Sequence, residues 1–248
     1  MRFSPLLSIV FAAVAAAGCA PADGDVVDTA ATATATAQTA MNSLTEQERA
    51  DGWRLLFDGH SLDAWKGFKT DTAPSGWEGI DGVLTRTTGG GDLVSRESFT
   101  NFELALDWKV DSAGNSGVMF HVTEDGELTY ETGPEMQVLD DAAHADGKSP
   151  LTSAGSAYGL YPAPRGVVKP AGEWNSVRLL VNGAHVEHWL NGERVVSYEL
   201  WSPDWEAKVA ASKFAQWPSY GRAASGGIAL QDHGDRVEFR NIRIRELP

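Results

Sequence analysis

Residues 102–110 read FELALDWKV, a run in which apolar and polar side chains alternate. In an extended strand this alternation places Leu104, Leu106, Trp108 and Val110 on one face and the polar residues opposite. A helix would instead repeat its apolar residues three and four positions apart. The run therefore predicts a β-strand with one face in a core, and a chain with such a strand must supply neighbouring strands to pair with it.

Two Asn-Gly pairs, at 182–183 and 191–192, separate three further strand-like runs at 174–181, 185–190 and 194–199. Asn-Gly is typical of two-residue hairpin turns, because both residues tolerate positive φ. Shorter runs follow the same pattern at 118–122, 135–139, 226–231 and 236–245. Short strands at intervals of roughly 8–12 residues predict an all-β sandwich. The best helix candidate is 202–217, which begins with Ser202 as cap and Pro203 in the first turn.

The first 18 residues combine Arg2 with an uncharged apolar run, Leu6–Ala17. This composition is typical of a secretory signal, and the run is short for a membrane span. The segment ends in Ala-Ala-Gly followed by Cys19, which resembles a bacterial lipoprotein signal. Cys19 is the only cysteine, so no disulfide can form within the chain. We therefore expect residues 1–18 to be a signal peptide and Cys19 to carry a lipid.

Residues 19–48 contain almost no large apolar side chains and include an Ala-Thr alternation at 30–37. Such a segment cannot form a core, and we expect a flexible tether to the membrane. The remaining residues, 49–248, hold all nine Trp and suit a single domain. The formal net charge of −14 repels phosphate, which argues against nucleic-acid binding and favours neutral ligands such as sugars.

Polar side chains share one face of the predicted strand at 135–139. Glu135 and Gln137 lie on the same side, and Met136 and Val138 on the other. In the preceding run, 118–122, His121 alternates away from its apolar neighbours. A carboxylate and a carboxamide in an apolar strand indicate either a polar cavity or the solvent face of a half-exposed sheet, and this stretch alone does not decide between them.

Five segments resemble the 3-keto-disaccharide hydrolase domain family. They are WRLLFDGHSLDAWKG, NSGVMFHV, PEMQVLDD, KPAGEWNSVRLLVNGAHVEHWLNG and GGIALQDHGDRVEFRNIRIREL, which occur in the family's order over nearly all of residues 51–248. The last two are the most specific. The resemblance implies a concanavalin A-like jelly-roll sandwich of two antiparallel sheets, with one or two short helices and a ligand groove on its concave face.

The resemblance also implies cleavage of 3-keto-glucosides or 3-keto-disaccharides outside the cytoplasm, after a partner sugar 3-dehydrogenase has oxidised C3. A ketone at C3 acidifies the C2 proton, so a base can remove it while the C1 substituent leaves, and water can then add to the product. This chemistry needs a base near C2, an acid or water near the glycosidic oxygen, and a cationic or hydrogen-donating group at the C3 oxygen. With its Cys19 lipid, the protein is expected on the outer membrane facing the periplasm.

Four residues are candidates for acid–base catalysis. Glu135 is the first choice as base or acid, and its alternative role is to bind sugar hydroxyls only. His188 stands between two aliphatic residues on its strand face, so it fits a core histidine as well as a catalyst. His233 lies beside a glycine, where a ligand can approach the backbone. Asp140 could be a base, an orienting partner of a histidine or a turn residue.

Five residues are candidates for substrate binding: Gln137, Gln231, Tyr158, His121 and Arg178. Tyr158 belongs to the long segment 142–169, and a loop of this length commonly covers a site. Arg178 is a candidate for stabilising an enolate oxygen. The role of His121 stays open, because the family often has an arginine or another polar residue there.

The sequence contains no recognisable metal-binding motif. It lacks HExxH, a cysteine cluster and an EF-hand loop, although scattered His, Asp and Glu side chains could still assemble a divalent site in space. No cofactor is therefore predicted. Two alternatives to an enzyme remain open, a non-catalytic glycan-binding lectin and a surface lipoprotein that only organises partners at the envelope.

Overall fold

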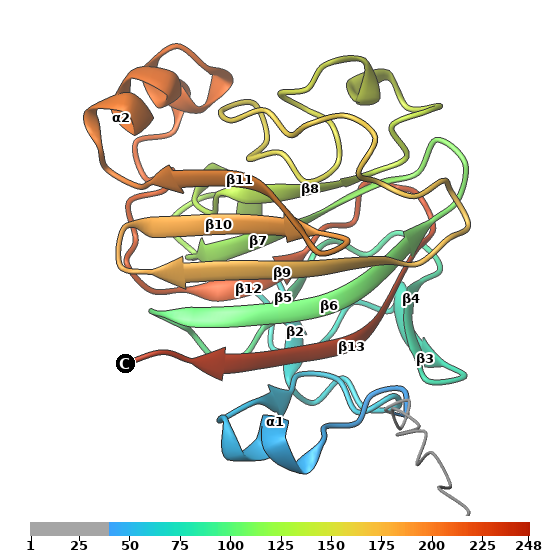
Figure 1. The fold of residues 1–248 in the computed structure, drawn as a ribbon. Coiled ribbons are helices and arrows are strands. Elements are labelled where there is room, and N and C mark those ends of the chain that lie inside the picture. Colours follow the sequence, from blue (N-terminus) through green and yellow to red (C-terminus); the bar gives the residue numbers. More distant parts are fainter. Residues whose placement is uncertain (1–39) are drawn as a thin grey trace, which may run out of the picture. The chain divides into compact units, whose positions relative to one another are not determined.

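Two antiparallel sheets pack face to face around one core (Figure 1) in the computed structural model, which describes residues 40–248. The predicted signal peptide 1–18, the predicted lipid attachment at Cys19 and most of the predicted tether 19–48 lie outside the described residues. No helix within residues 40–248 is long and apolar enough to cross a membrane.

The larger sheet has eight strands, in the order β11-β10-β9-β6-β13-β4-β3, and β1 pairs with β13. Its strands are β1 (Arg54–Leu55), β3 (Trp77–Ile80), β4 (Val83–Arg86), β6 (Phe102–Val110), β9 (Asn175–Asn182), β10 (His185–Leu190), β11 (Glu193–Glu199) and β13 (Val237–Glu246). The smaller sheet has the order β2-β5-β12-β7-β8. Its strands are β2 (Trp65–Gly67), β5 (Leu93–Ser95), β7 (Asn115–Val122), β8 (Glu135–Leu139) and β12 (Gly227–Leu230). The predicted all-β sandwich of two antiparallel sheets is confirmed.

Strand β6 has the bounds and the faces that its alternation predicts. Leu104, Leu106 and Trp108 are buried in the core between the sheets. Both Asn-Gly hairpins are also confirmed, since His185 pairs with Asn182 and Leu190 with Glu193 across their turns.

The predicted helix at 202–217 is in fact two elements. Helix α2 (Pro203–Ala210) begins where expected, with the Ser202 hydroxyl accepting a hydrogen bond from the Trp205 amide at 3.2 Å. It ends at Ala210, and a short 3-10 turn, η3 (Lys213–Gln216), follows. The Ser212 hydroxyl caps this turn by accepting from the Phe214 amide. A second capping serine therefore interrupts a segment whose composition favours a helix throughout.

Three other short helical elements complete the fold: α1 (Glu46–Ala50), η1 (Thr129–Glu131) and η2 (Ala145–Lys148). Residues before α1 already belong to the domain, because the Asn42 side chain and backbone exchange two 2.8 Å hydrogen bonds with Asn241 of β13. The Asn42 amide group also donates to the Gly82 carbonyl. The folded part thus begins before residue 49.

A bulge at His121 breaks the alternation of β7. His121 has φ of +51°, and the pairing of β7 with β12 shifts register beside it. Val122 consequently packs with Met119 on the outer face of the small sheet instead of facing the core. The His121 ring lies against Phe102 and Phe120 of the core.

Candidate active site

A cavity of about 240 Å³ opens over the outer face of the small sheet near β8. Its lining residues come from β7, β8, η1, the loop after β8, η3 and the loop after β12, and they are Asn115, Tyr130, Glu135, Gln137, Tyr158, Lys213, Gln231 and His233. All eight side chains carry polar groups. The polar face predicted for residues 135–139 therefore lines a cavity and does not face open solvent.

Glu135 lies on the floor of this cavity, over a position of β7 that has no side chain. A Cβ atom added to Gly117 would lie 2.0 Å from Glu135 Oε1, so only glycine leaves room for the carboxylate. The residue is 7% exposed. Burial raises the pKa of Glu135 to about 8, the positive charge of Lys213 opposes this rise, and the negative charges of Asp92 and Asp146 add to it. The carboxyl group is therefore poised to exchange a proton near neutral pH.

Lys213 brings a positive charge to the same cavity from the turn η3. Its Nζ lies 4.4 Å from the centre of the Tyr158 ring and 5.8 Å from that of Tyr130, distances at which aromatic faces attract a cation. The Tyr158 hydroxyl donates to Asp146 Oδ2 at 3.2 Å. Burial, together with the charges of Asp146 and Glu135, raises the pKa of Tyr158 to about 12, so its phenol stays neutral.

The loop after β8 closes the outer edge of that strand, as its predicted covering role requires. The Tyr158 amide donates to the Glu135 carbonyl, the Gly155 amide donates to the Gln137 carbonyl, and the Gln137 amide donates to the Ser156 carbonyl. The side-chain amide of Gln137 also donates to a loop carbonyl, that of Thr152, at 3.3 Å. These bonds satisfy an otherwise open sheet edge and fix Tyr158 above the cavity.

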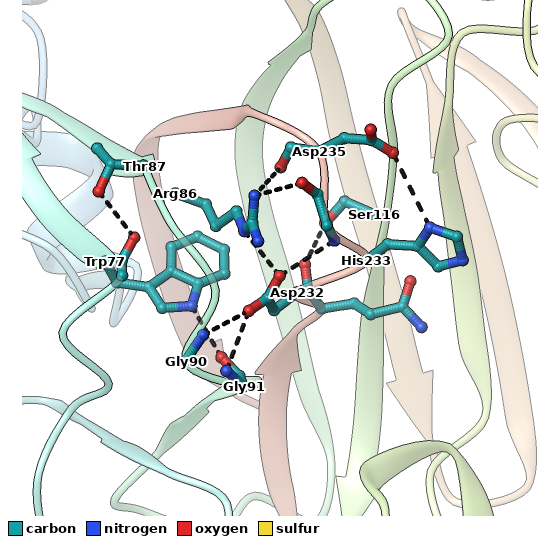
Figure 2. A network of polar contacts seen from close by, with 12 residues as sticks. Trp77, Arg86, Thr87, Gly90, Gly91, Ser116, Asp232, His233 and Asp235 are labelled. Atoms are coloured by element: carbon teal, nitrogen blue, oxygen red, sulfur yellow. Dashed lines mark hydrogen bonds and ion pairs between the residues drawn. The ribbon is translucent and has the colours of Figure 1, made fainter.

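The loop after β12 carries Gln231 and His233. Asp232, which lies between them, anchors this loop (Figure 2). Asp232 Oδ2 accepts from the amides of Gly90 and Gly91 at 2.9 and 3.0 Å. The glycine run between β4 and β5 thus serves as an anchor, because it presents two adjacent amides to one carboxylate.

Arg86 of β4 completes this anchor. Its Nε lies 2.7 Å from Asp232 Oδ1, and both side chains are only 7% exposed. Nη1 of the same arginine donates to the carbonyls of Gly234 and Asp235. Asp235 in turn accepts from the Asn115 amide at 3.1 Å and lies 3.9 Å from His233 Nδ1, as Figure 2 shows for the histidine. The glycine run, Arg86 and Asn115 therefore hold the loop from three sides, and this fixes the backbone that carries Gln231 and His233.

His188 does not line the cavity, so its candidate role as a catalyst is wrong. It is fully buried between the sheets, where Nδ1 donates to the Gly155 carbonyl at 3.0 Å and Nε2 lies 3.4 Å from the Tyr198 hydroxyl. Burial lowers the pKa of His188 to about 4, so the ring is neutral. Its position between two aliphatic neighbours fits the core histidine that was the alternative.

Three further candidates also lie away from the cavity. Asp140 accepts from the amides of Ala113 and Ala142, as a turn residue does. Arg178 is on β9 of the opposite sheet, where it forms an ion pair with Glu103 and stacks on Trp189. His121 is buried by its bulge, and its Nε2 donates to the Thr100 carbonyl at 2.9 Å.

Five predicted residues therefore meet in the cavity, and they are Glu135, Gln137, Tyr158, Gln231 and His233. The sequence analysis missed three others. Asn115 is the first residue of β7 and precedes the run 118–122 that was predicted as a strand. Lys213 belongs to the segment predicted as a helix, and Tyr130 belongs to no predicted strand or helix. Hairpin and strand signals do not reveal which loops return to a given sheet face, and no local signal would have found Tyr130 or Lys213.

Metal ligands are not grouped in the described part of the chain. Within residues 40–248, no three His, Cys, Asp or Glu side chains come close enough together to hold an ion. The chemistry available in the cavity is that of one carboxyl group, one imidazole, one ammonium group, two phenols and three carboxamides.

Known proteins resemble this chain over most of its length. Residues 52–245 match the family described as the 3-keto-alpha-glucoside-1,2-lyase-like domain. A 3-keto-disaccharide hydrolase of Bacteroides thetaiotaomicron is 38% identical, with 84% of this chain and 82% of the relative covered.

Two crystal structures from Parabacteroides distasonis, both of proteins assigned as glycosyl hydrolases, share the fold. The first has a TM-score of 0.79 and is 37% identical in sequence, and the match covers 84% of this chain and 100% of the chain in that structure. The second has a TM-score of 0.64 and is 32% identical, and the match covers 79% of this chain and 99% of the chain in that structure. The chain therefore belongs to the 3-keto-alpha-glucoside-1,2-lyase-like domain family.

Proposed function

We propose that this protein cleaves 3-keto-glucosides, including 3-keto-disaccharides, by removing the C2 proton and eliminating the C1 substituent. The observation that carries the proposal is the Glu135 carboxyl group, buried beside the Lys213 ammonium group with its pKa raised to about 8. Family membership and the hydrolase named above support a glycoside-cleaving enzyme.

Glu135 is the base in this proposal. The C2 proton next to a ketone is weakly acidic, and a carboxylate whose conjugate acid has a pKa near 8 takes it more readily than an ordinary carboxylate. As the proton moves to Glu135, the C2–H electron pair forms the bond between C1 and C2, and the C1–O bond breaks. Gly117 has no side chain, so it leaves room for the Glu135 carboxylate on the floor of the cavity, where the carboxylate can contact the sugar.

Lys213 stabilises the charge that develops on the C3 oxygen. Removal of the C2 proton makes this oxygen enolate-like, and a cation positioned beside it lowers the energy of that state. The two tyrosine rings beside Nζ hold the ammonium group in place. Lys213 thus takes the role that the sequence analysis gave to Arg178.

His233 is the group that meets the leaving oxygen. It lines the cavity with its ring 6.1 Å from that of His144 in the covering loop, and it is more exposed than Glu135, so a departing sugar can reach solvent past it. His233 donates a hydrogen bond to the leaving oxygen, which takes its proton from water, and addition of water across the new double bond completes a net hydrolysis.

A glycan-binding protein without catalysis would need amides and aromatic surfaces, but no carboxyl group poised to titrate near pH 8. Asn115, Gln137, Gln231 and the tyrosines would serve either function. The buried, ionisable Glu135 beside a cation is the feature that favours an enzyme.

The test is to incubate the purified protein with a 3-keto-glucoside and with its unoxidised parent, with and without a chelator. We expect cleavage of the keto substrate only, with deuterium from D₂O at C2. Because the base acts in its deprotonated form, kcat/KM should rise with pH and level off above about 8. Binding of both compounds without cleavage of either would contradict the proposal.

Glu135→Gln removes the base and keeps the shape of the side chain. We expect turnover to fall by about 10²–10⁴-fold while substrate binding is largely retained. Glu193→Gln is the matched control, because Glu193 is exposed on β11 and does not line the cavity. Unchanged turnover in Glu135→Gln would exclude Glu135 as the base.

We further propose that the enzyme works in the cell envelope, attached to the outer membrane on its periplasmic side by a lipid on Cys19. A dehydrogenase that oxidises C3 of the sugar would supply its substrate. The signal-like segment that ends at Cys19 supports this location, and the supply of substrate follows from the need for a ketone at C3.

A further inference from the structure

A second hollow of about 400 Å³ adjoins the cavity on the outer face of the small sheet. The two share three lining residues: Tyr130, Gln231 and His233. The second hollow is lined further by Phe68, Gly91, Asp92, Glu127, Leu128, Thr129 and Asp232. His233 therefore stands at the junction of two spaces, with Glu135 in only one of them.

The second hollow is pre-formed, because one carboxylate holds two of its walls. Asp92 Oδ1 accepts from the Asp232 amide at 2.8 Å, and Asp92 Oδ2 accepts from the Thr129 hydroxyl. The first bond fixes the loop that carries Gln231 and His233, and the second fixes η1. A ligand entering this space meets walls that are already ordered.

The lining combines apolar and hydrogen-bonding groups. Phe68 is half-buried, and Leu128 is 46% exposed, which is unusual for a leucine in this domain. Asp92, Glu127 and Gln231 provide acceptors and an amide around them. A sugar ring has this same character, with apolar C–H faces and hydroxyl groups at its rim, whereas the three acidic side chains of the lining, Asp92, Glu127 and Asp232, disfavour an anionic ligand.

We propose that the second hollow binds the leaving-group sugar of a 3-keto-disaccharide, while the first cavity holds the keto sugar. This inference rests on the proposed function. It places the glycosidic oxygen at the junction of the two spaces, next to His233, where a hydrogen-bond donor to the leaving oxygen is needed. The chain would then prefer disaccharides to glucosides with a small substituent.

The test compares a 3-keto-disaccharide with the methyl 3-keto-glucoside, which has no second ring. Leu128→Ala should lower kcat/KM about fivefold for the disaccharide and leave the methyl glucoside unchanged. Phe68→Leu, which keeps apolar volume against the sheet but removes the aromatic face, should act in the same direction. Leu151→Ala is the matched control, because Leu151 is similarly exposed, at 41%, and lies outside both spaces.

A loss of preference in the first two variants and not in the control supports the second site. If both variants affect the two substrates equally, or if the wild type shows no preference, the second site is wrong while the proposed function stands. If the wild type cleaves neither substrate, the proposed function is wrong and the site for a leaving group falls with it.

Discussion

Burial of Glu135, the proposed base, lowers the stability of the folded protein at neutral and higher pH. Glu135 has a pKa of about 8 in the folded chain, against an ordinary value of 4.5. Below pH 4.5 the group is protonated in both the folded and the unfolded states. Between 4.5 and about 8 the unfolded chain gives up this proton while the folded chain keeps it, so the free energy of unfolding falls as pH rises.

Glu135→Gln should therefore stabilise the protein while it lowers turnover. Each unit of pKa difference corresponds to about 1.4 kcal/mol, so we expect a gain on the order of 4 kcal/mol in the free energy of unfolding at pH 8, and little gain at pH 4. Urea titrations of variant and wild type at both pH values measure this. If the free energy of unfolding depends on pH equally in the two proteins, folding does not raise the pKa of Glu135, and the prediction is wrong.

The position of a single side chain could be predicted where strand periodicity fixes the face on which it lies. It could not be predicted where a segment distant in the sequence folds back onto the site. Glu135 and Gln137 were assigned to one face because side chains alternate along a strand. The same rule failed for His121, because a bulge reverses the face at that position. Lys213 reaches the cavity only through the placement of η3, which depends on long-range packing.

At the scale of elements, the buried pair of Arg86 and Asp232 connects the fold to the site. Arg86 lies on β4 of the large sheet, and Asp232 lies in the loop that presents Gln231 and His233 (Figure 2). Asp232 also draws in two amides of the glycine run. Asp232 lies more than 140 positions after this run, so no local sequence pattern connects the two.

Arg86→Met should destabilise the protein and impair catalysis together. Removing one partner of a buried ion pair leaves an uncompensated charge, and we expect a loss of about 3–5 kcal/mol in the free energy of unfolding. Activity should fall even where the variant is fully folded, because the loop after β12 loses its anchor. Arg236→Met is the control, since its ion pair with Glu238 is more exposed and should cost about 1 kcal/mol or less. Equal effects of the two substitutions would contradict this role.

Element boundaries followed the sequence closely in the strands and less well in the helical segment. The predicted bounds of β6, β8 and β10 agree with the structure, because each run ends at a turn residue or a change of periodicity. The segment 202–217 contains no glycine and no proline after Pro203, so its composition gave no sign of the break at Ala211 and Ser212.

At the scale of the whole molecule, the sandwich assembles the site from six separate segments. The small sheet provides the floor of the cavity, and the segments containing η1, η2 and η3 provide its walls. No single stretch of the sequence indicates that these segments come together. The family resemblance identified the fold because long segments match in order. It could not by itself separate a cavity residue such as His233 from a core residue such as His188.

Every residue of the cavity and of the core, as far as the structure describes the chain, lies within residues 40–248. We therefore expect a chain of residues 38–248 to unfold at the same urea concentration as the full chain and to have the same kcat/KM. A chain of residues 44–248 lacks Asn42 and its three hydrogen bonds, and should lose roughly 2–3 kcal/mol of stability.

Only the location in the cell should depend on the preceding segment. In bacteria that express the full chain, Cys19→Ser should move the protein from the membrane fraction to the soluble fraction without changing kcat/KM, because the lipid contributes attachment and the domain contributes the chemistry. Fractionation followed by assay of the 3-keto-glucoside measures both properties. Retention of the Cys19→Ser protein on membranes would contradict the lipid anchor, and a parallel loss of kcat/KM would contradict the independence of the domain.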